Sequence, residues 1–527
     1  MKKTIALLGV LIACTVNVSA KSLSFCSEGN PETLTPAFNT ISTSFDVTSQ
    51  IYDNLVTFRP GSTDVVPSWA TRWTVSSDGL EYVFSLRQGV KWHANQFFQP
   101  TRDFNADDVI FTFERQWKPS HPYYSVTSAK HPYFQTSIEP YLKTIEKLDD
   151  YTIRITIKEP ITPFVSNFGM RWGGIQSAEY AQAMQKMGRP ERIDLFPIGT
   201  GPFQFDRYER DKLVNFKAFD RYWAGRSRID ELSFLIFPDP KERWEKLKEG
   251  VCQIMGLPNP GQLSEMREDP RMVLVSQVGM NVSYMSYNVK QAPFNDVRVR
   301  RALNLAIDRR KILRQVYKHT AIPASNPMPP MLWGYNRNLE DDLYDPEEAK
   351  KLLAKAGYPN GLTAEILAMT VQRPYMPNAV DVAKGIQADL ARIGVNLTIR
   401  SPDWQDYLKA MRVGDYQLAL YGWTGDNGDP DNFLNTLLGC ESVGGHNVAH
   451  FCHPQYDELV RRARTTQGRD ERALLYEQAQ EIFKDQAPWF TIAHVAQFKV
   501  MRREVVGFQM SYFGRHDFWG VDVLPER

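Results

Sequence analysis

Residues 418–433 read Leu-Ala-Leu-Tyr-Gly-Trp-Thr-Gly-Asp-Asn-Gly-Asp-Pro-Asp-Asn-Phe. The apolar start of this stretch predicts a strand, and the glycines and acids that follow predict a turn at its end. Open α/β sheets bind ligands beyond the ends of their strands, so this turn would present carboxylates to a ligand. Taken alone, such clusters are more often plain turns, and both interpretations stay open here. A calcium loop is disfavoured because Pro430 would occupy its fifth position.

Strand and helix patterns alternate along the chain and predict a mixed α/β fold. Residues 82–86 and 151–157 alternate apolar and polar side chains, as half-buried strands do. Asn105 stands at the N-cap position of a helix that continues through Trp117. A later helix is predicted over residues 379–393, between two strands. Strands separated by helices are typical of an α/β sheet.

The pattern changes near residue 280. A strand over 282–287 is followed by a helix predicted from about residue 296 to residue 316, and strand–helix alternation then continues. We therefore expect one lobe before this point and a second lobe after it. Strand-like crossings near 281–288 and 489–500 would form a hinge between the lobes.

The composition is that of a globular protein with two or three domains. The chain has 527 residues, of which 43% are hydrophobic, and a formal net charge of +1. This length is sufficient for several domains, each with its own core. Because the charge is nearly balanced, neither nucleic acid nor an anionic membrane surface is predicted as a partner.

The first residues have the pattern of an export signal. Two lysines precede an apolar stretch over residues 5–13, and Val18-Ser19-Ala20 provides small residues for cleavage. We predict a signal peptide over residues 1–20. A bacterial lipoprotein signal with lipid on Cys14 is the alternative, although the region before Cys14 is short for one. Either signal would place the mature chain outside the cytoplasm, and we predict the periplasm.

Four cysteines remain after the signal peptide. An even number of cysteines in an exported protein suggests disulfides. Cys440 and Cys452 lie close together in a loop-like segment and are predicted to pair. By elimination, Cys26 would pair with Cys252. A metal site is disfavoured because no CxxC or HxxxH spacing is present.

Enzyme motifs are missing from the sequence. The nine histidines are scattered, and no GxSxG nucleophile elbow or HExxH zinc motif occurs. The run Gly199-Thr200-Gly201 lacks the lysine of a phosphate loop and predicts a turn. Hydrolysis by an acidic pair around Asp426 stays open, because the separation of carboxylates is not visible in a sequence. We predict a protein that is not an enzyme, with no catalytic residue, metal or cofactor.

Several stretches carry a resemblance to one family over essentially the whole mature chain. They are Trp73–Tyr82, Arg87–His93, Phe104–Val109, Pro197–Phe203, Phe219–Trp223 and Val297–Leu303. In this order, and together with the four cysteines, they resemble the extracytoplasmic solute-binding proteins of peptide-transporting ABC systems. The resemblance is strongest to the periplasmic dipeptide-binding proteins and their haem-binding relatives.

The resemblance implies a bilobed α/β fold of the periplasmic-binding-protein type, with two lobes joined by a two-strand hinge. The first lobe would comprise residues 21–280 and 497–527, with an inserted subdomain over about 55–180. The second lobe would comprise residues 281–496. A short peptide would be captured between the lobes.

The resemblance also implies two residues that hold the ends of the ligand. An Asp after the Gly-Trp motif holds the α-ammonium of the peptide, and this residue is Asp426. An Arg holds the α-carboxylate, and this residue is Arg373. An Arg fork matches a carboxylate, and a fixed carboxylate receives an ammonium. A peptide of the wrong length would leave a buried charge unpaired, so the pair would select dipeptides.

Other residues are predicted around this pair. Edge groups near Gly422 and Thr424 would hold the ligand backbone as an added strand. Trp423 is predicted as a wall of the pocket. Further candidates for the pocket are Tyr375, Trp404 and, on the first-lobe side, Thr40 and Ser42.

The predicted function is that of a monomeric receptor that delivers dipeptides to an inner-membrane ABC permease. Haem, a longer peptide or glutathione on the same scaffold is the alternative. Haem would need an apolar slot or a Cys, His or Tyr that can ligate its iron. A peptidase is the hypothesis from another class, and it lacks a recognisable nucleophile or metal site.

Overall fold

A computed structural model describes residues 20–128, 130–340 and 343–525, without the side chains of residues 404, 405 and 412. The predicted signal peptide, apart from its last residue, and the alternative lipid site at Cys14 lie outside the described residues. Within them, each helix is too short or too polar to cross a bilayer.

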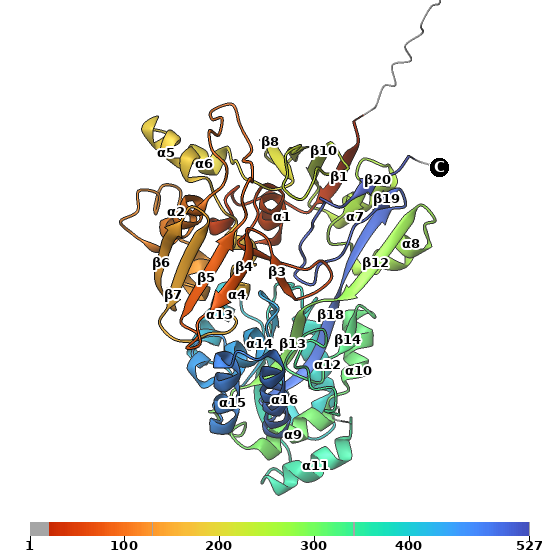
Figure 1. Cartoon of the computed structure of the whole chain (residues 1–527). Helices are drawn as coiled ribbons and strands as arrows, with labels where there is room; N and C mark the ends of the chain where they lie inside the picture. The colour runs from red at the N-terminus through yellow and green to blue at the C-terminus, as the bar shows by residue number, and fades with distance from the viewer. Residues whose placement is uncertain (1–19, 129, 341–342, 526–527) are drawn as a thin grey trace, which may run out of the picture.

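A 12-stranded sheet runs through the whole molecule (Figure 1). Its order is β16 (Val395–Arg400), β15 (Leu362–Leu367), β17 (Leu418–Thr424), β13 (Asn281–Tyr287), β18 (Trp489–Arg502), β11 (Ile254–Met255), β1 (Ser22–Ser27), β10 (Glu231–Ile236), β9 (Leu213–Ala218) and β8 (Phe203–Glu209). Two more strands, β12 (Met272–Val278) and β14 (Ala321–Pro323), also pair with β18.

The long strand β18 connects the two parts of this sheet. Its first half pairs with β13 and its second half pairs with β12, both antiparallel. The chain changes sides at Gly279, whose N–H donates to the carbonyl of Val495 at 2.9 Å. The Asn281 side chain bridges the same point, since its amide donates to Val495 O at 3.0 Å and its carbonyl accepts from Val495 N at 2.8 Å. Two strand segments therefore cross between the parts.

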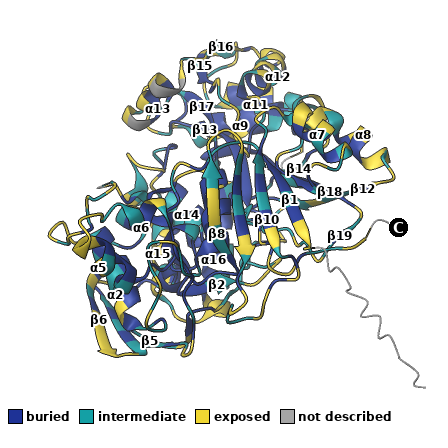
Figure 2. Ribbon diagram, turned by 90° about the horizontal axis from the view of Figure 1, so that it is seen from above, coloured by how far each residue is buried: buried dark blue, intermediate teal, exposed yellow. Residues whose placement is uncertain are grey.

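The part below this crossing in Figure 1, which we call the second lobe, is built around the largest hydrophobic core. That core contains buried residues from Met280 to Ala493, and helices cover both faces of its strands. These helices are α9 (Val297–Ala306), α10 (Arg309–Ile312), α11 (Pro346–Lys355), α12 (Ala379–Ala391), α13 (Trp404–Val413), α14 (Asp431–Leu438), α15 (Pro454–Thr465) and α16 (Arg469–Gln486). Exposed residues concentrate on their outward faces (Figure 2).

The long helix predicted over residues 296–316 is wrong in its extent. Helix α9 ends at Ala306, and Ile307 has the extended backbone angles φ −100° and ψ 118°. Asp308 then caps a new helix, because its side chain accepts a hydrogen bond from the N–H of Lys311 at 2.9 Å. A short π-helix over Leu313–Tyr317 follows α10. The apolar periodicity continues across the break, and the local cap overrides it.

The remainder of the molecule, which we call the first lobe, contains the other end of the large sheet and a separate sheet of four antiparallel strands. The order of this second sheet is β4 (Ala70–Val75), β5 (Glu81–Leu86), β7 (Thr152–Ile157) and β6 (Leu142–Asp149). A core of buried residues from Phe45 to Ile175 packs beneath it. Smaller elements of this lobe are α1 (Ser42–Ile51), β2 (Val56–Phe58), β3 (Val65–Pro67), α3 (Pro132–Ser137), α4 (Phe164–Asn167), η2 (Arg171–Gly173), α5 (Ala178–Lys186), α6 (Arg192–Leu195), α7 (Pro240–Lys248) and α8 (Leu263–Glu268).

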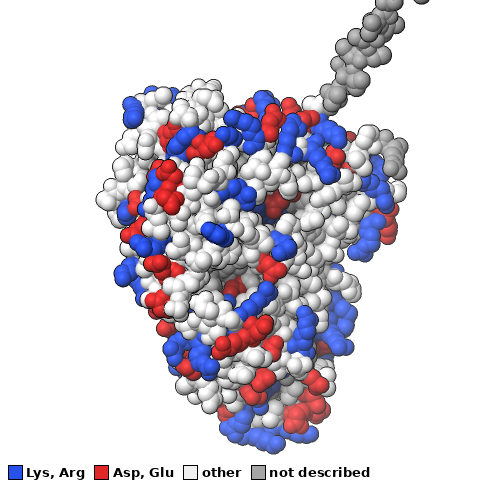
Figure 3. All heavy atoms as spheres, viewed as in Figure 1, with Lys and Arg blue, Asp and Glu red and all other residues white. Residues whose placement is uncertain are grey.

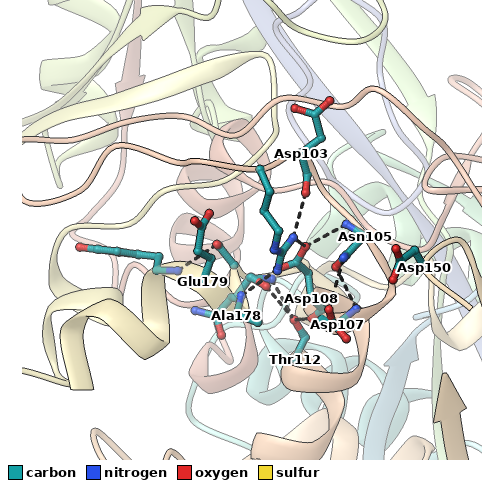
Figure 4. Close-up of polar contacts among 12 residues, drawn as sticks. Asp103, Asn105, Asp107, Asp108, Thr112, Asp150, Ala178 and Glu179 are labelled. Atoms are coloured by element: carbon teal, nitrogen blue, oxygen red, sulfur yellow. Dashed lines mark hydrogen bonds and ion pairs between the residues drawn. The ribbon is translucent and has the colours of Figure 1, made fainter. Parts of the chain in front are cut away.

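Helix α2 (Ala106–Trp117) begins where the sequence predicts it, with a capping box (Figure 4). The Asn105 side chain accepts from the N–H of Asp107 at 3.0 Å, and the Asp108 side chain accepts from the N–H of Asn105 at 3.0 Å. Asp108 also accepts from the N–H of Ala178 at 2.8 Å, which ties α2 to the start of α5. One buried carboxylate thus fixes both the helix start and its packing partner.

Both predicted disulfides are present. Cys26 in β1 pairs with Cys252, which lies two residues before β11. Cys440 pairs with Cys452 in the segment between α14 and α15. Closing a loop of the unfolded chain stabilises a fold by about 2–4 kcal/mol in typical cases. The pairing from spacing and elimination is confirmed.

Candidate functional site

A cavity of about 440 Å³ lies where the turn after β17 faces the first lobe. Residues Thr424 to Asp426 line it from the second lobe. The face shown in Figure 3 is hollowed between the upper and lower parts of the molecule, and both basic and acidic side chains lie around the hollow. The aromatic side chains on the cavity wall are Phe45, Phe58, Tyr133, Trp172, Phe513 and Trp519. Its charged side chains are Arg59, Arg171, Arg228, Asp426, Arg515 and Asp517.

Asp426 is positioned by the backbone of its own turn. Its N–H donates to the side-chain carbonyl of Asn432 at 3.1 Å, and the indole N–H of Trp423 donates to the same oxygen at 3.0 Å. The preceding Gly425 donates to the carbonyl of Met280 at 2.7 Å. A Cβ atom at Gly425 would lie 2.7 Å from the sulfur of Met280, so a larger residue would displace the turn.

The carboxylate of Asp426 is half-buried and has no ion-pair partner among the described residues. Burial raises its pKa to about 6, while the nearby Arg171 guanidinium and a hydrogen bond from Asn432 partly oppose that rise. Tyr133 approaches from the first lobe, and burial together with the Asp426 charge raises the pKa of its hydroxyl to about 12. The site therefore holds a carboxylate that its own fold leaves poorly compensated.

Arg171 belongs to a small charged network of the first lobe. Its guanidinium lies 3.7 Å from the Asp46 carboxylate and 4.9 Å from the centre of the Phe45 ring. Asp46 is buried and also contacts the His516 ring nitrogen at 2.7 Å. Helix α1, η2 and the C-terminal segment thus converge behind the cavity wall.

The other two acids of the turn, Asp429 and Asp431, contact arginines of their own lobe. Asp429 forms a buried, bidentate ion pair with Arg472 of α16, at 2.8 and 2.9 Å. Its carboxylate also accepts from the N–H of Asp431 at 3.0 Å, at the start of α14. Asp431 lies 3.8 Å from Arg464, and burial raises its pKa to about 6. Asp429 therefore stabilises the turn through its ion pair with Arg472, and Asp431 lies at the start of α14.

The two lobes touch directly beside the cavity. The Asn427 amide donates to the side-chain carbonyl of Asn167 at 2.8 Å, which joins the turn to α4. The Thr162 hydroxyl donates to the carbonyl of Thr466 at 2.7 Å, and the Arg464 guanidinium donates to the Tyr141 hydroxyl at 2.6 Å. These contacts join the two lobes on the side of α15.

The predicted ligand residues occupy different surroundings. Asp426 and Thr424 line the cavity, and Arg373 is not among its lining residues. Arg373 is exposed in the loop after β15 and donates a hydrogen bond to the hydroxyl of Tyr375. The Tyr375 ring packs on Gly422, where a Cβ atom would lie 2.3 Å from the ring. Gly422 is therefore required for this close approach.

The remaining predicted residues are placed as follows. Trp423 is half-buried and contacts the His446 ring at 4.9 Å, outside the cavity lining. The N–H and the hydroxyl of Thr40 both donate to the carboxylate of Glu32, at 2.6 and 2.7 Å. Ser42 is the exposed first residue of α1, whose Phe45 lines the cavity instead. Trp404 begins α13, and its side chain lies outside the described part of the chain.

Sequence reasoning missed the first-lobe wall. Arg171 and Tyr133 come from the region predicted as a subdomain, while Arg228 and Arg515 come from segments far apart in the chain. None of them stands in a distinctive local pattern. The one signal in the sequence for this wall was the expected return of the C-terminal chain to the first lobe. That return brings residues 507–520 to the cavity.

No group of three or more His, Cys, Asp or Glu side chains is arranged for metal binding within the described residues. Among the residues that line the cavity, Tyr133, Met170 and Met510 have side chains of a kind that ligates haem iron. The arrangement is suited to holding a small molecule with both charged and apolar parts.

Comparisons with known proteins identify the family of the chain. Residues 64–445 match the family described as bacterial extracellular solute-binding proteins, family 5 middle. The chain is 44% identical to the dipeptide-binding protein of Escherichia coli (strain K12) over 518 residues, 97% of each chain. It is 44% identical to heme-binding protein A of Haemophilus influenzae over 516 residues, covering 97% of this chain and 94% of that one.

A solved structure has the same fold. The dipeptide-binding protein from Pseudoalteromonas sp. SM9913, in complex with Met-Leu, superposes with a TM-score of 0.78 at 33% identity. The match covers 95% of this chain and the whole of that chain (100%). The chain therefore belongs to the bacterial extracellular solute-binding proteins of family 5.

Proposed function

We propose that the protein captures dipeptides between its two lobes and delivers them to an inner-membrane ABC permease. The observation that carries this proposal is Asp426, a half-buried carboxylate without an ion pair among the described residues, at the end of β17. Burying a charge is costly unless a partner is supplied. The α-ammonium of a peptide would supply it. The 44% identity to a dipeptide-binding protein supports the same ligand class.

Strand β17 provides a surface for the backbone of the ligand. One edge of β17 pairs with β13 along the whole strand. The opposite edge pairs with β15 only at Leu418 and Ala419, and no other described strand pairs with it beyond Ala419. The free edge ends near Thr424, next to the turn that holds Asp426. An extended peptide added there would form main-chain hydrogen bonds that do not depend on its side chains.

Arg373 would hold the α-carboxylate at the other end of the ligand. Its hydrogen-bond partner Tyr375 packs on Gly422, so the guanidinium is tied to the same strand whose end carries Asp426. On binding, Arg373 would move from the loop after β15 toward the cavity. Trp423 and Tyr375 would then flank the peptide, while Trp404, Thr40 and Ser42 stay predictions at its periphery.

The proposal also includes removal of the signal peptide and movement of the two lobes against each other. Residues 1–20 would be removed on export to the periplasm, and the mature protein would act as a monomeric receptor without enzymatic activity. Residues 21–280 and 497–527, with a subdomain over about 55–180, would move against residues 281–496. The crossing at Gly279 and Val495 would then serve as the hinge.

Haem is the second candidate ligand. A relative with 44% identity is named heme-binding protein A, and six aromatic side chains line the cavity together with four arginines. Apolar walls would receive the macrocycle, arginines its carboxylates, and Tyr133 its iron. Haem and dipeptides make different demands on Asp426, since only the peptide offers an ammonium.

Calorimetry of the purified mature protein with Ala-Ala, N-acetyl-Ala-Ala and haem would test the proposal. We expect binding of the free dipeptide and at least tenfold weaker binding of the acetylated one, because acetylation removes the ammonium. The variant Asp426→Asn should lose this discrimination, whereas Asp415→Asn, with a side chain 73% exposed in the same lobe, should keep it. Equal affinity for both peptides would refute the role of Asp426. Binding of haem without binding of either peptide would make haem the ligand in place of a dipeptide.

A further inference from the structure

The charges around the cavity are strongly unbalanced. Four of its six charged lining residues are arginines, and the two acids are Asp426 and Asp517. Asp517 is already paired, because the Arg515 guanidinium donates to it at 2.6 Å. Asp426 is the acid that would receive the ligand's ammonium. The cavity therefore offers more positive charge than its own acids compensate.

Arg59 and Arg228 carry this excess. Both are exposed and line the cavity, and neither forms an ion pair with a described residue. Arg171 differs from them, since Asp46 lies 3.7 Å from its guanidinium. Arg59 follows β2, and Arg228 lies in the loop before β10, so they come from separate parts of the first-lobe wall.

The surroundings of these arginines are suited to a carboxylate rather than to water alone. Phe58 and Trp519 line the same cavity and give its wall apolar surface. A guanidinium beside apolar walls is less screened and forms stronger, charge-assisted bonds to a carboxylate than one on an open surface. Its fork also matches the geometry of a carboxylate.

We propose that Arg59 and Arg228 form a subsite for a second carboxylate of the ligand, carried by an acidic side chain. This inference rests on the proposed function, in which Asp426 and Arg373 hold the two ends of a dipeptide. A dipeptide that contains Asp or Glu adds a negative charge, and the first-lobe arginines compensate it when the lobes enclose the ligand. The receptor therefore prefers acidic dipeptides to their neutral counterparts of the same size.

Paired peptides isolate this charge. Ala-Glu and Ala-Gln have nearly the same shape, as do Glu-Ala and Gln-Ala, and both pairs sample the two side-chain positions. Calorimetry with the wild-type mature protein should show at least tenfold tighter binding of the acidic member in one pair. In Arg59→Gln and Arg228→Gln, the preference should fall at least threefold, with the affinity for the neutral peptide changed less than twofold. Arg210→Gln, whose side chain is 81% exposed, is the control.

The outcomes separate this inference from the function on which it rests. Equal binding of acidic and neutral peptides by the wild type would overturn the acidic-side-chain subsite and leave the dipeptide receptor intact. Equal loss of affinity for both members of a pair in the variants would also overturn it, because the arginines would then hold the main-chain carboxylate. Failure of every peptide to bind would instead refute the proposed function. Thermal unfolding of each variant checks that the fold is retained.

Discussion

Asp426 and Asp429 lie in the same turn, and the fold treats their carboxylates in opposite ways. Asp429 is buried against α16 and is bound by both nitrogens of the Arg472 fork, at 2.8 and 2.9 Å. Asp426 is half-buried at the cavity, has no ion pair among the described residues, and has its pKa raised to about 6 by burial. The Asp429 carboxylate is neutralised inside the protein, whereas the Asp426 carboxylate has no ion pair among the described residues.

Under the proposed function, the difference separates a structural acid, Asp429, from a functional one, Asp426, within a single motif. A buried ion pair with good geometry is retained because removal of either member leaves an unpaired charge. A carboxylate kept at a cavity without compensation is destabilising for the free protein, and such groups concentrate at functional sites. Composition alone does not separate the two, since both are aspartates between glycines and a proline.

The largest effect on the free energy of unfolding is expected from removing the carboxylate of Asp429. Asp429→Ala should lower the free energy of unfolding by about 3–5 kcal/mol, because Arg472 would stay buried without its partner. Urea unfolding followed by circular dichroism measures this change. The double variant Asp429→Ala/Arg472→Leu should be less destabilised than the sum of the single variants. Additive losses would show that the pair is not coupled.

The functional acid should behave in the reverse way. Asp426→Asn should weaken dipeptide binding at least tenfold, or about 1.4 kcal/mol, and leave the free energy of unfolding unchanged or higher. The amide keeps the shape of the side chain and removes a charge that is costly to bury. Calorimetry and urea unfolding on the same preparation measure both quantities. A large loss of stability with unchanged affinity would assign Asp426 to the structural class.

The raised pKa of Asp426 predicts a pH dependence of binding. Below about pH 6 the carboxyl group becomes protonated and cannot pair with an ammonium, so dipeptide affinity should fall as pH decreases from 7 to 5. The termini of the ligand keep their charges over this range. Stability has the opposite sign, because a carboxyl whose folded pKa exceeds its unfolded value destabilises the fold as pH rises through about 6. Asp426→Asn should flatten the pH dependence of binding, as measured by calorimetry. It should only reduce the pH dependence of stability, as measured by urea unfolding, because burial also raises the pKa of Asp431 to about 6.

The smallest effect is expected at the residue that positions Asp426. Asn432→Ala removes the oxygen that accepts from the N–H of Asp426 and from the indole of Trp423. The loss of such bonds typically costs about 0.5–1.5 kcal/mol, so dipeptide affinity should fall about two- to tenfold. Titration calorimetry checks the affinity, and a loss greater than that of Asp426→Asn would contradict a positioning role.

Much of the fold was predictable where the structure of a short segment depends on its own residues. The capping box at Asn105, the helix over 379–393, which the structure has at Ala379–Ala391, and both disulfides follow from residue types and spacing. The prediction over 296–316 was wrong because periodicity does not register the local cap at Asp308. The strand before Asp426 was also predicted, and the structure has it at Leu418–Thr424, whereas the role of Asp426 toward a ligand stays a prediction.

What the sequence alone determined is the identity of the local elements, the family resemblance, and the turn that carries Asp426. These follow from hydrogen bonds and side-chain patterns within about a dozen residues. Only the tertiary structure decided what faces that turn. Arg472 pairs with Asp429, and Arg171, Arg59 and Arg228 surround the cavity, because folding brings distant segments together. Electrostatic interactions act over a few ångströms of space, and distance along the chain does not predict them.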